Sequence, residues 1–158
     1  MEWSEKFKQK LYQKELALQE NKKNFQVYQN LALELFNFIE QKIKPIEVIS
    51  TVKYMVGQSE NTPVQIKALK LKCNKKYLDF VPEGINLDHS KGTIRIRHNS
   101  RAIAQFSYLH LVVDSSSDAV YPANLIWVLN ENSSENFEKL PVFDASQLER
   151  LIELTFLD

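Results

Sequence analysis

The chain has few of the residues that build disulfide frameworks, metal centres and phosphate-binding loops. Only one of its 158 residues is a cysteine, Cys73, so no disulfide can form within the chain. Three histidines and three glycines are present. The glycines are scattered and form none of the glycine-rich loops that cradle nucleotide phosphates. The sequence thus supports neither a disulfide-stabilised scaffold nor a nucleotide site of those kinds, and we expect no cofactor and no metal.

Long apolar segments are also absent. No apolar run reaches the roughly 18 residues that a membrane-spanning helix needs, and residues 1–20 lack the apolar core of a secretory signal. Hydrophobic residues make up 44% of the chain and charged residues 25%, values typical of a globular protein. We therefore expect a soluble, cytoplasmic protein that makes no membrane contact and folds as a single domain over residues 1–158.

The N-terminal quarter of the chain carries a helical pattern. Neither glycine nor proline occurs before Pro45, and apolar residues recur every seven positions. This pattern predicts helix over residues 3–43, as one long helix or as two that join near residues 20–24, with an end at Lys44-Pro45. Residues 25–43 are the more apolar half, so we expect them to pack on the core, whereas residues 1–24 project or dock on a partner.

After Pro45 the apolar residues alternate, as they do in strands. Strands are predicted at residues 46–57, 64–73, 77–81, 92–97, 103–113 and 123–131. The short connections between them exclude parallel crossovers. A last helix is predicted at residues 145–157, with Asp144 as its N-cap. The predicted fold is α+β: an antiparallel sheet of five to six mostly sequential strands, with the long N-terminal helix and the short C-terminal helix packed against one face.

Two of the predicted strands contain residues that a regular strand does not accommodate. In the strand at residues 64–73, Ile66 and Ala68 alternate on one face and Leu69 and Leu71 on the other, so a regular strand would expose one set. A β-bulge at Ala68-Leu69 would turn both sets toward the core. The Pro-Glu-Gly sequence at residues 82–84 favours a turn after the preceding strand.

Charge is balanced overall but unevenly distributed. Residues 61–113 hold nine basic and three acidic side chains, a net charge of +6, whereas residues 114–158 have a net charge of −7. In the segment GTIRIRHNSR, residues 92–101, isoleucines alternate with arginines, so the isoleucines should face the core and the arginines the solvent. With lysines of a neighbouring strand, the arginines would form a basic strand face that comprises Lys70, Lys72, Arg95, Arg97 and Arg101.

This basic strand face has three interpretations. It is a solvated surface, a site for an anion such as nucleic acid, or a site for an acidic protein. The aromatic platform on which proteins stack single-stranded bases is not evident in the sequence, where only Tyr77 and Tyr108 are near.

The residues with catalytic potential form no recognisable constellation. His89 and His98 lie in predicted loops, and His110 lies between two leucines, a place typical of a hydrogen-bonded core histidine. Cys73 lies in an apolar strand, where a thiol is usually inert. A nucleophilic pair of Cys73 and His110 would require their strands to be neighbours in the right register.

The first half of the N-terminal helix carries an apolar stripe, which comprises Trp3, Phe7, Leu11 and Leu18. A helix that is longer than the sheet it crosses exposes such residues unless a partner or a second copy covers them. The sequence therefore favours a small cytoplasmic, non-catalytic binding or adaptor protein that acts through protein–protein contacts or self-association. The alternative is a nucleic-acid-binding accessory protein that uses the basic strand face, and an enzyme of unidentified class comes third.

Overall fold

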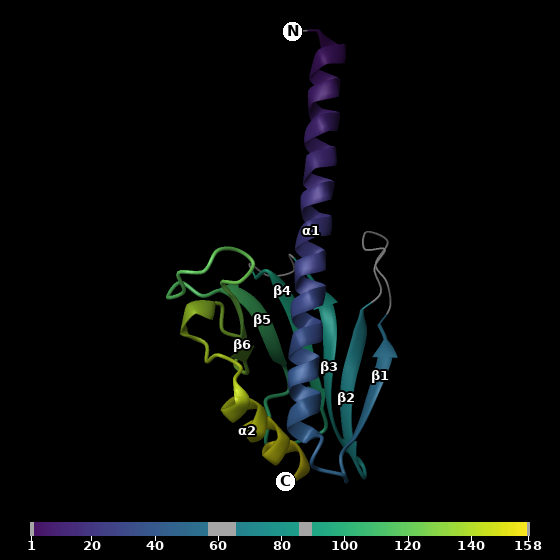
Figure 1. The fold of residues 1–158 in the computed structure, drawn as a ribbon, viewed down its shortest axis with the longest axis vertical. Coiled ribbons are helices and arrows are strands. Elements are labelled where there is room, and N and C mark those ends of the chain that lie inside the picture. Colours follow the sequence, from purple (N-terminus) through teal and green to yellow (C-terminus); the bar gives the residue numbers. More distant parts are fainter. Residues whose placement is uncertain (1, 57–65, 86–89, 158) are drawn as a thin grey trace.

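The computed structural model describes residues 2–56, 66–85 and 90–157, which form two α-helices and six strands (Figure 1). Helix α1 spans Trp3–Ile43 and helix α2 spans Ala145–Phe156. The strands are β1 Ser50–Met55, β2 Lys67–Cys73, β3 Lys76–Gly84, β4 Gly92–His98, β5 Ser107–Val113 and β6 Leu125–Asn130, and a short 3-10 helix, η1, spans Phe137–Lys139.

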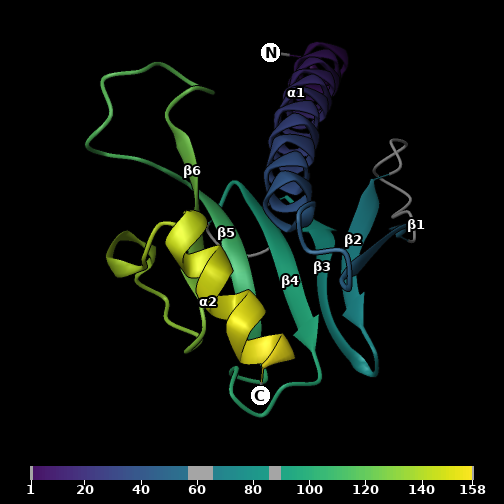
Figure 2. The ribbon, with the colours of Figure 1, turned by 60° about the horizontal axis from the view of Figure 1, so that its bottom comes forward.

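The six strands form one open sheet in the order β1-β2-β3-β4-β5-β6, and each pairs antiparallel with the next. Both helices cover the same face of this sheet (Figures 1 and 2). We call this the inner face and the opposite one the outer face. The predicted fold, α+β with a long first helix, a sequential antiparallel sheet and a short last helix, is confirmed.

Helix α1 is continuous, without a break near residues 20–24. It ends where expected, with Lys44 as its C-cap and Pro45 after it. Its buried residues begin at Phe25 and end at Ile43, whereas residues 2–23 are exposed throughout. The exposed half extends well beyond the sheet, with the N-terminus at its far end (Figure 1).

The core lies between the inner face and the two helices. Inner-face side chains alternate along each strand, as the pleat requires. They are Leu69 and Leu71 on β2, Leu78 and Phe80 on β3, Ile94 and Ile96 on β4, Leu109 and Leu111 on β5, and Trp127 and Leu129 on β6, all of them buried. As predicted, Ile94 and Ile96 face the core.

Tyr28 fixes α1 to the middle of the sheet. Its side chain is fully buried, and its hydroxyl donates to the backbone oxygen of Thr93 at 2.7 Å and accepts from the backbone N–H of Gly84 at 3.3 Å. Burial raises the pKa of Tyr28, so the hydroxyl stays protonated as the first bond requires. The ring lies on Gly92, where an added Cβ would be 2.3 Å from it. These contacts set the place where α1 leaves the domain.

Helix α2 closes the other end of the inner face. The Asp144 side chain accepts from the backbone N–H of Gln147 at 3.0 Å, which confirms the predicted N-cap. Leu148, Leu151 and Thr155 are its buried residues. An ion pair between Lys42 of α1 and Glu149 of α2 links the two helices.

The structure differs from the predicted strands in several places. No bulge occurs at Ala68-Leu69, because β2 pairs with β1 in unbroken register. Instead Ala68 is buried on the outer face, opposite Tyr54. Residues 82–84 continue β3, with a register shift there that accommodates the proline, so the predicted turn is wrong. Residues 46–49 and 103–106 precede their strands, and the predicted positions 57, 64, 65 and 89 lie outside the described residues.

Within residues 2–56, 66–85 and 90–157, no helix combines the length and the apolar character that crossing a bilayer requires.

Candidate functional site

The apolar stripe lies on the exposed half of α1. Trp3 is 76% exposed, Phe7 50%, Leu11 46% and Leu18 53%. The rings of Trp3 and Phe7 stack on each other, with centroids 5.4 Å apart. At 3.6 residues per turn, the four residues fall within an arc of about 80°, which is the same side of α1 that is buried from Phe25 onward. The surface that packs on the sheet therefore continues as an uncovered apolar surface into the solvent.

The stripe is separate from the other apolar residues of the projecting half. Tyr12 and Leu16 are 62% and 46% exposed, but they lie on the opposite side of α1. Lys14 falls within the stripe, between Leu11 and Leu18. The stripe is thus one narrow seam with a basic interruption, the pattern of a helix that pairs with another helix.

A loop meets α1 where the helix leaves the domain. The Tyr121 hydroxyl donates to the Asn24 side-chain oxygen at 2.9 Å. In the same loop Val120 is 81% exposed, and Tyr121 is 46% exposed. Exposed apolar surface therefore occurs at the base of the projecting half as well as along it.

The outer face carries the basic residues of the candidate anion site. Lys70 and Lys72 on β2 and Arg95 and Arg97 on β4 all point outward, as the strand register shows. Lys70 lies over the ring of Tyr77, with its Nζ 4.7 Å from the centroid. Four cations thus gather on the half of the outer face that β1 to β4 provide.

Asp79, on β3 between these cations, is the acidic residue at their centre. It pairs in register with Lys70 and Arg97 and is only 2% exposed. Its Oδ2 accepts from the Tyr54 hydroxyl at 2.5 Å, whereas its buried Oδ1 has no hydrogen-bond partner among the described residues. Burial raises the pKa of Asp79, and the Tyr54 hydroxyl, Lys70 and Arg97 act in the opposite direction.

Tyr54 therefore covers part of this face. Its side chain reaches from β1 across β2 to Asp79 on β3, and so it passes over its direct partner Ala68. Burial and the Asp79 carboxylate raise the pKa of Tyr54, which keeps the phenol protonated. With Asp79 buried beneath its neighbours, the surface exposed on this half of the sheet is basic.

The other half of the outer face is covered. The η1 residue Phe137 stacks on His110, with ring centroids 4.3 Å apart, and His110 is 2% exposed. The Asn130 amide donates to the Ser134 backbone oxygen at 2.9 Å and to His110 Nε2 at 3.2 Å. Because Nε2 accepts, the His110 proton lies on Nδ1, which is 3.5 Å from the Thr93 hydroxyl. His110 is a hydrogen-bonded structural residue.

The other residues for which the sequence suggested a role do not come together in one site. Cys73 lies on β2 with its side chain on the same face as Leu71, the inner face, whereas His110 lies on β5 on the outer face, so the two form no nucleophilic pair. Arg101 was predicted to belong to the basic strand face, but it lies in the connection between β4 and β5 and is not part of the outer face. Nearby, His98 holds this connection: its Nε2 donates to the Ala104 backbone oxygen at 2.8 Å.

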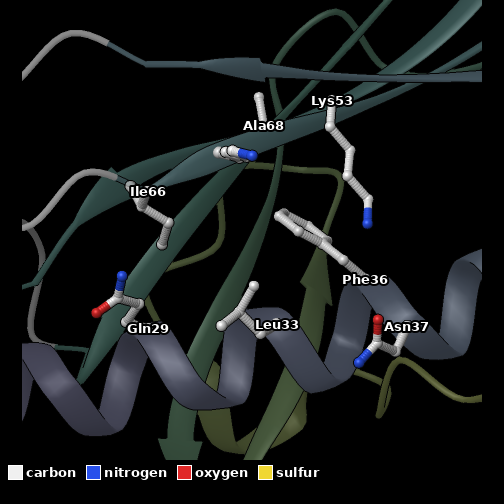
Figure 3. A pocket seen from close by; sticks show the side chains of 8 residues that line it. Gln29, Leu33, Phe36, Asn37, Lys53, Ile66 and Ala68 are labelled. Carbon is white, nitrogen blue, oxygen red and sulfur yellow. The ribbon is translucent and has the colours of Figure 1, made fainter.

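A groove of about 290 Å³ opens between α1 and the β1–β2 edge of the sheet (Figure 3). Leu33 and Phe36 of α1 and Ile66 beside β2 give it apolar walls. Its other lining residues are Gln29, Asn37, Lys53, Lys67 and Ala68. The Lys53 ammonium is 2.8 Å from Glu40, so this charge is already paired. The described part of the lining does not offer the convergent polar groups of a catalytic site.

Among the described residues, no three histidine, cysteine, aspartate or glutamate side chains come together as metal ligands. No family model matches the chain, and neither a curated protein nor a solved structure matches it significantly. The candidate sites therefore depend on the geometry of this chain alone.

The sequence could not show two elements of these sites. Asp79 looks like an ordinary solvated carboxylate, and no local signal brings Tyr54 to it across an intervening strand. The Phe137 cover of His110 likewise depends on a polar loop that turns back over the sheet.

Proposed function

We propose that this chain is a small, non-catalytic, cytoplasmic protein-binding module, and that the apolar stripe on the projecting half of α1 is its binding surface. The observation that carries the proposal is the exposure of Trp3, Phe7, Leu11 and Leu18 along one side of the helix. Monomeric proteins rarely leave a continuous apolar surface of this kind in water, and such surfaces mark interaction sites.

The length of the helix supports the same function. About 20 residues project, equivalent to about 30 Å at 1.5 Å per residue. An isolated helix of this length is only marginally stable in water without packing on one face. A partner that covers the stripe supplies that packing, in the way amphipathic helices dock into apolar grooves or onto other helices.

The experiment places a photoreactive phenylalanine analogue at Phe7 or at Leu18 and irradiates host cells that express the variant. Tyr12 and Leu16, exposed on the opposite side of the same helix, provide the matched control positions. We expect a discrete covalent adduct with a protein from the stripe positions and none from the control positions. The adduct should disappear when Trp3 and Leu11 are both replaced by serine. Equal adduct formation from both sides of the helix would refute the proposal.

A second candidate function is the binding of single-stranded nucleic acid on the outer face. It is favoured by the four cations gathered there, around a central acid that is buried. Phosphate contacts of this kind produce a steep salt dependence. Tyr77 already stacks under Lys70 and offers one aromatic ring, fewer than dedicated single-strand binders use.

This second function is tested by the fluorescence anisotropy of a labelled single-stranded oligonucleotide at several salt concentrations. If all four cations neutralise phosphates, log K should fall against log salt with a slope of about −3. Replacing Lys72 by glutamine should reduce the slope by about 0.7, whereas the control Lys44→Gln, at the end of α1, should leave it unchanged. Equal effects of the two variants, or no binding, would exclude the site.

A further inference from the structure

We propose that the apolar stripe binds a second copy of this chain, with the two projecting helices antiparallel. The inference rests on the proposed function of the stripe and names its partner. It is carried by the length of the exposed segment, by the placement of charges along it, and by the apolar loop at its base.

The order of the side chains along the segment favours one antiparallel register. In the proposed register, the numbers of two residues that lie opposite each other add up to 25. Phe7 then lies opposite Leu18 of the other copy, and Leu11 lies opposite its Lys14. Residues 3–22 of both helices then overlap completely. A shift by one heptad in one direction would place Lys14 opposite Ser4, so the aliphatic stem of Lys14 would lose its apolar partner. A shift in the other direction would place the second helix against Phe25 and Tyr28. These side chains already pack in the core of their own domain, so they are not available to a second copy.

Charge favours antiparallel over parallel pairing. In a parallel pair, Lys14 of each chain would lie against Lys14 of the other, in the middle of the seam, and like charges there disfavour the pair. In the antiparallel register, Lys14 lies opposite Leu11, so its aliphatic stem packs on the leucine while its ammonium reaches water. Beside the seam, Lys8 of each chain then lies near Glu15 of the other, which gives two attractive pairs.

The base of the helix receives the far end of the second copy. In this register Trp3 of one chain lies on the same flank of the seam as Asn24 of the other, near the base of its projecting half. Asn24 is the residue that the Tyr121 hydroxyl contacts, and Val120 and Tyr121 are exposed there. The most exposed aromatic residue of the stripe therefore meets the exposed apolar loop of the other domain, and both are covered.

Four apolar side chains per chain form a small interface, so we expect a dimer that dissociates on dilution. The first measurement is the molar mass by light scattering over a range of concentrations. The mass should rise from 18.5 kDa toward twice that value, and replacing Leu11 and Leu18 by serine should keep it at the monomer value. The matched control, in which Tyr12 and Leu16 are replaced by serine, should still dimerise.

Cysteine cross-linking tests the orientation in a background in which Cys73 is replaced by serine. Ser4 and Asn21 lie opposite each other in the proposed register, and neither belongs to the apolar stripe. Under mild oxidation, a mixture of the S4C and N21C variants should form cross-linked dimers, whereas each variant alone should form few. Cross-linking of each variant with itself, and none in the mixture, would overturn the antiparallel arrangement.

A charge exchange provides an independent test of the register. E15K replaces each attractive pair between Lys8 and Glu15 with a pair of lysines. This change should weaken dimerisation about threefold to tenfold. Adding K8E should restore it, because the attractive pairs are re-formed with opposite signs. In a parallel pair, Glu15 would instead lie near Lys10, so rescue by K10E and not by K8E would overturn the register.

The outcomes separate this inference from the function on which it rests. A chain that stays monomeric at every concentration overturns the second-copy inference. If the stripe positions nevertheless form photo-adducts with a different protein, the stripe remains a binding surface. If they form no adduct of any kind, both the partner and the function are wrong.

Discussion

The contact between Tyr28 and Gly92 leads to a specific prediction about Gly92→Ala. An added Cβ at this position would lie 2.3 and 2.7 Å from two carbon atoms of the Tyr28 ring, closer than carbon atoms approach without displacement. The ring cannot move freely, because it is fully buried and its hydroxyl is held by Thr93 and Gly84. Either the ring or strand β4 must therefore shift.

The cost follows from two contributions. Overpacking a close-packed site costs about 1–3 kcal/mol. Displacing the ring also weakens its two hydrogen bonds, each worth about 1 kcal/mol. We expect Gly92→Ala to lower the free energy of unfolding by about 2–5 kcal/mol. For a chain of this length, that corresponds to a fall in melting temperature of roughly 5–20 °C.

The assay is urea denaturation of a double-mutant cycle that combines Gly92→Ala with Tyr28→Leu. Each variant alone should be destabilised. In the Tyr28→Leu background, the alanine no longer meets the ring, so its cost should fall by about 1 kcal/mol or more. If Gly92→Ala leaves the midpoint unchanged, or if the two costs simply add, Tyr28 is not held against Gly92 as the structure describes.

Two further predictions concern stability. In dilute solution, urea denaturation should show that Leu11→Ala changes the free energy of unfolding by less than about 0.5 kcal/mol. Ile39→Ala, in the buried half of the same helix, should instead lower it by about 2–5 kcal/mol. Similar losses for the two variants would mean that the stripe is part of the core. The raised pKa of Asp79 means that the folded state binds its proton more tightly than the unfolded state, so this group makes wild type lose stability as pH rises above the ordinary aspartate pKa. The Asp79→Asn variant lacks this titration, so its free energy of unfolding relative to wild type should increase as pH rises above the ordinary aspartate pKa. A difference between the two proteins that stays constant or falls with pH would contradict the raised pKa of Asp79.

The sequence predicts the large elements because their signals are local. The absence of glycine and proline before Pro45 defines α1 and its end, and the short connections require sequential antiparallel strands. Asp144 carries its own capping signal. These features need no knowledge of what lies across the sheet.

The errors arise where burial depends on a cross-strand neighbour. Ala68 needs no bulge, because Tyr54 covers it on the outer face. Pro82 continues β3, because a register shift beside it accommodates the residue. The burial of Asp79 and its raised pKa follow from contacts among three strands, which no pattern along one strand can show.

The central claim, that a second chain covers the apolar stripe, is tested most directly by amide hydrogen exchange in residues 4–20. A helix of this length that packs on nothing exchanges nearly as fast as an unfolded peptide. We predict protection of these amides that increases with protein concentration and is lost when Leu11 and Leu18 are replaced by serine. Fast exchange at every concentration, or equal protection in the serine variant, would contradict the claim.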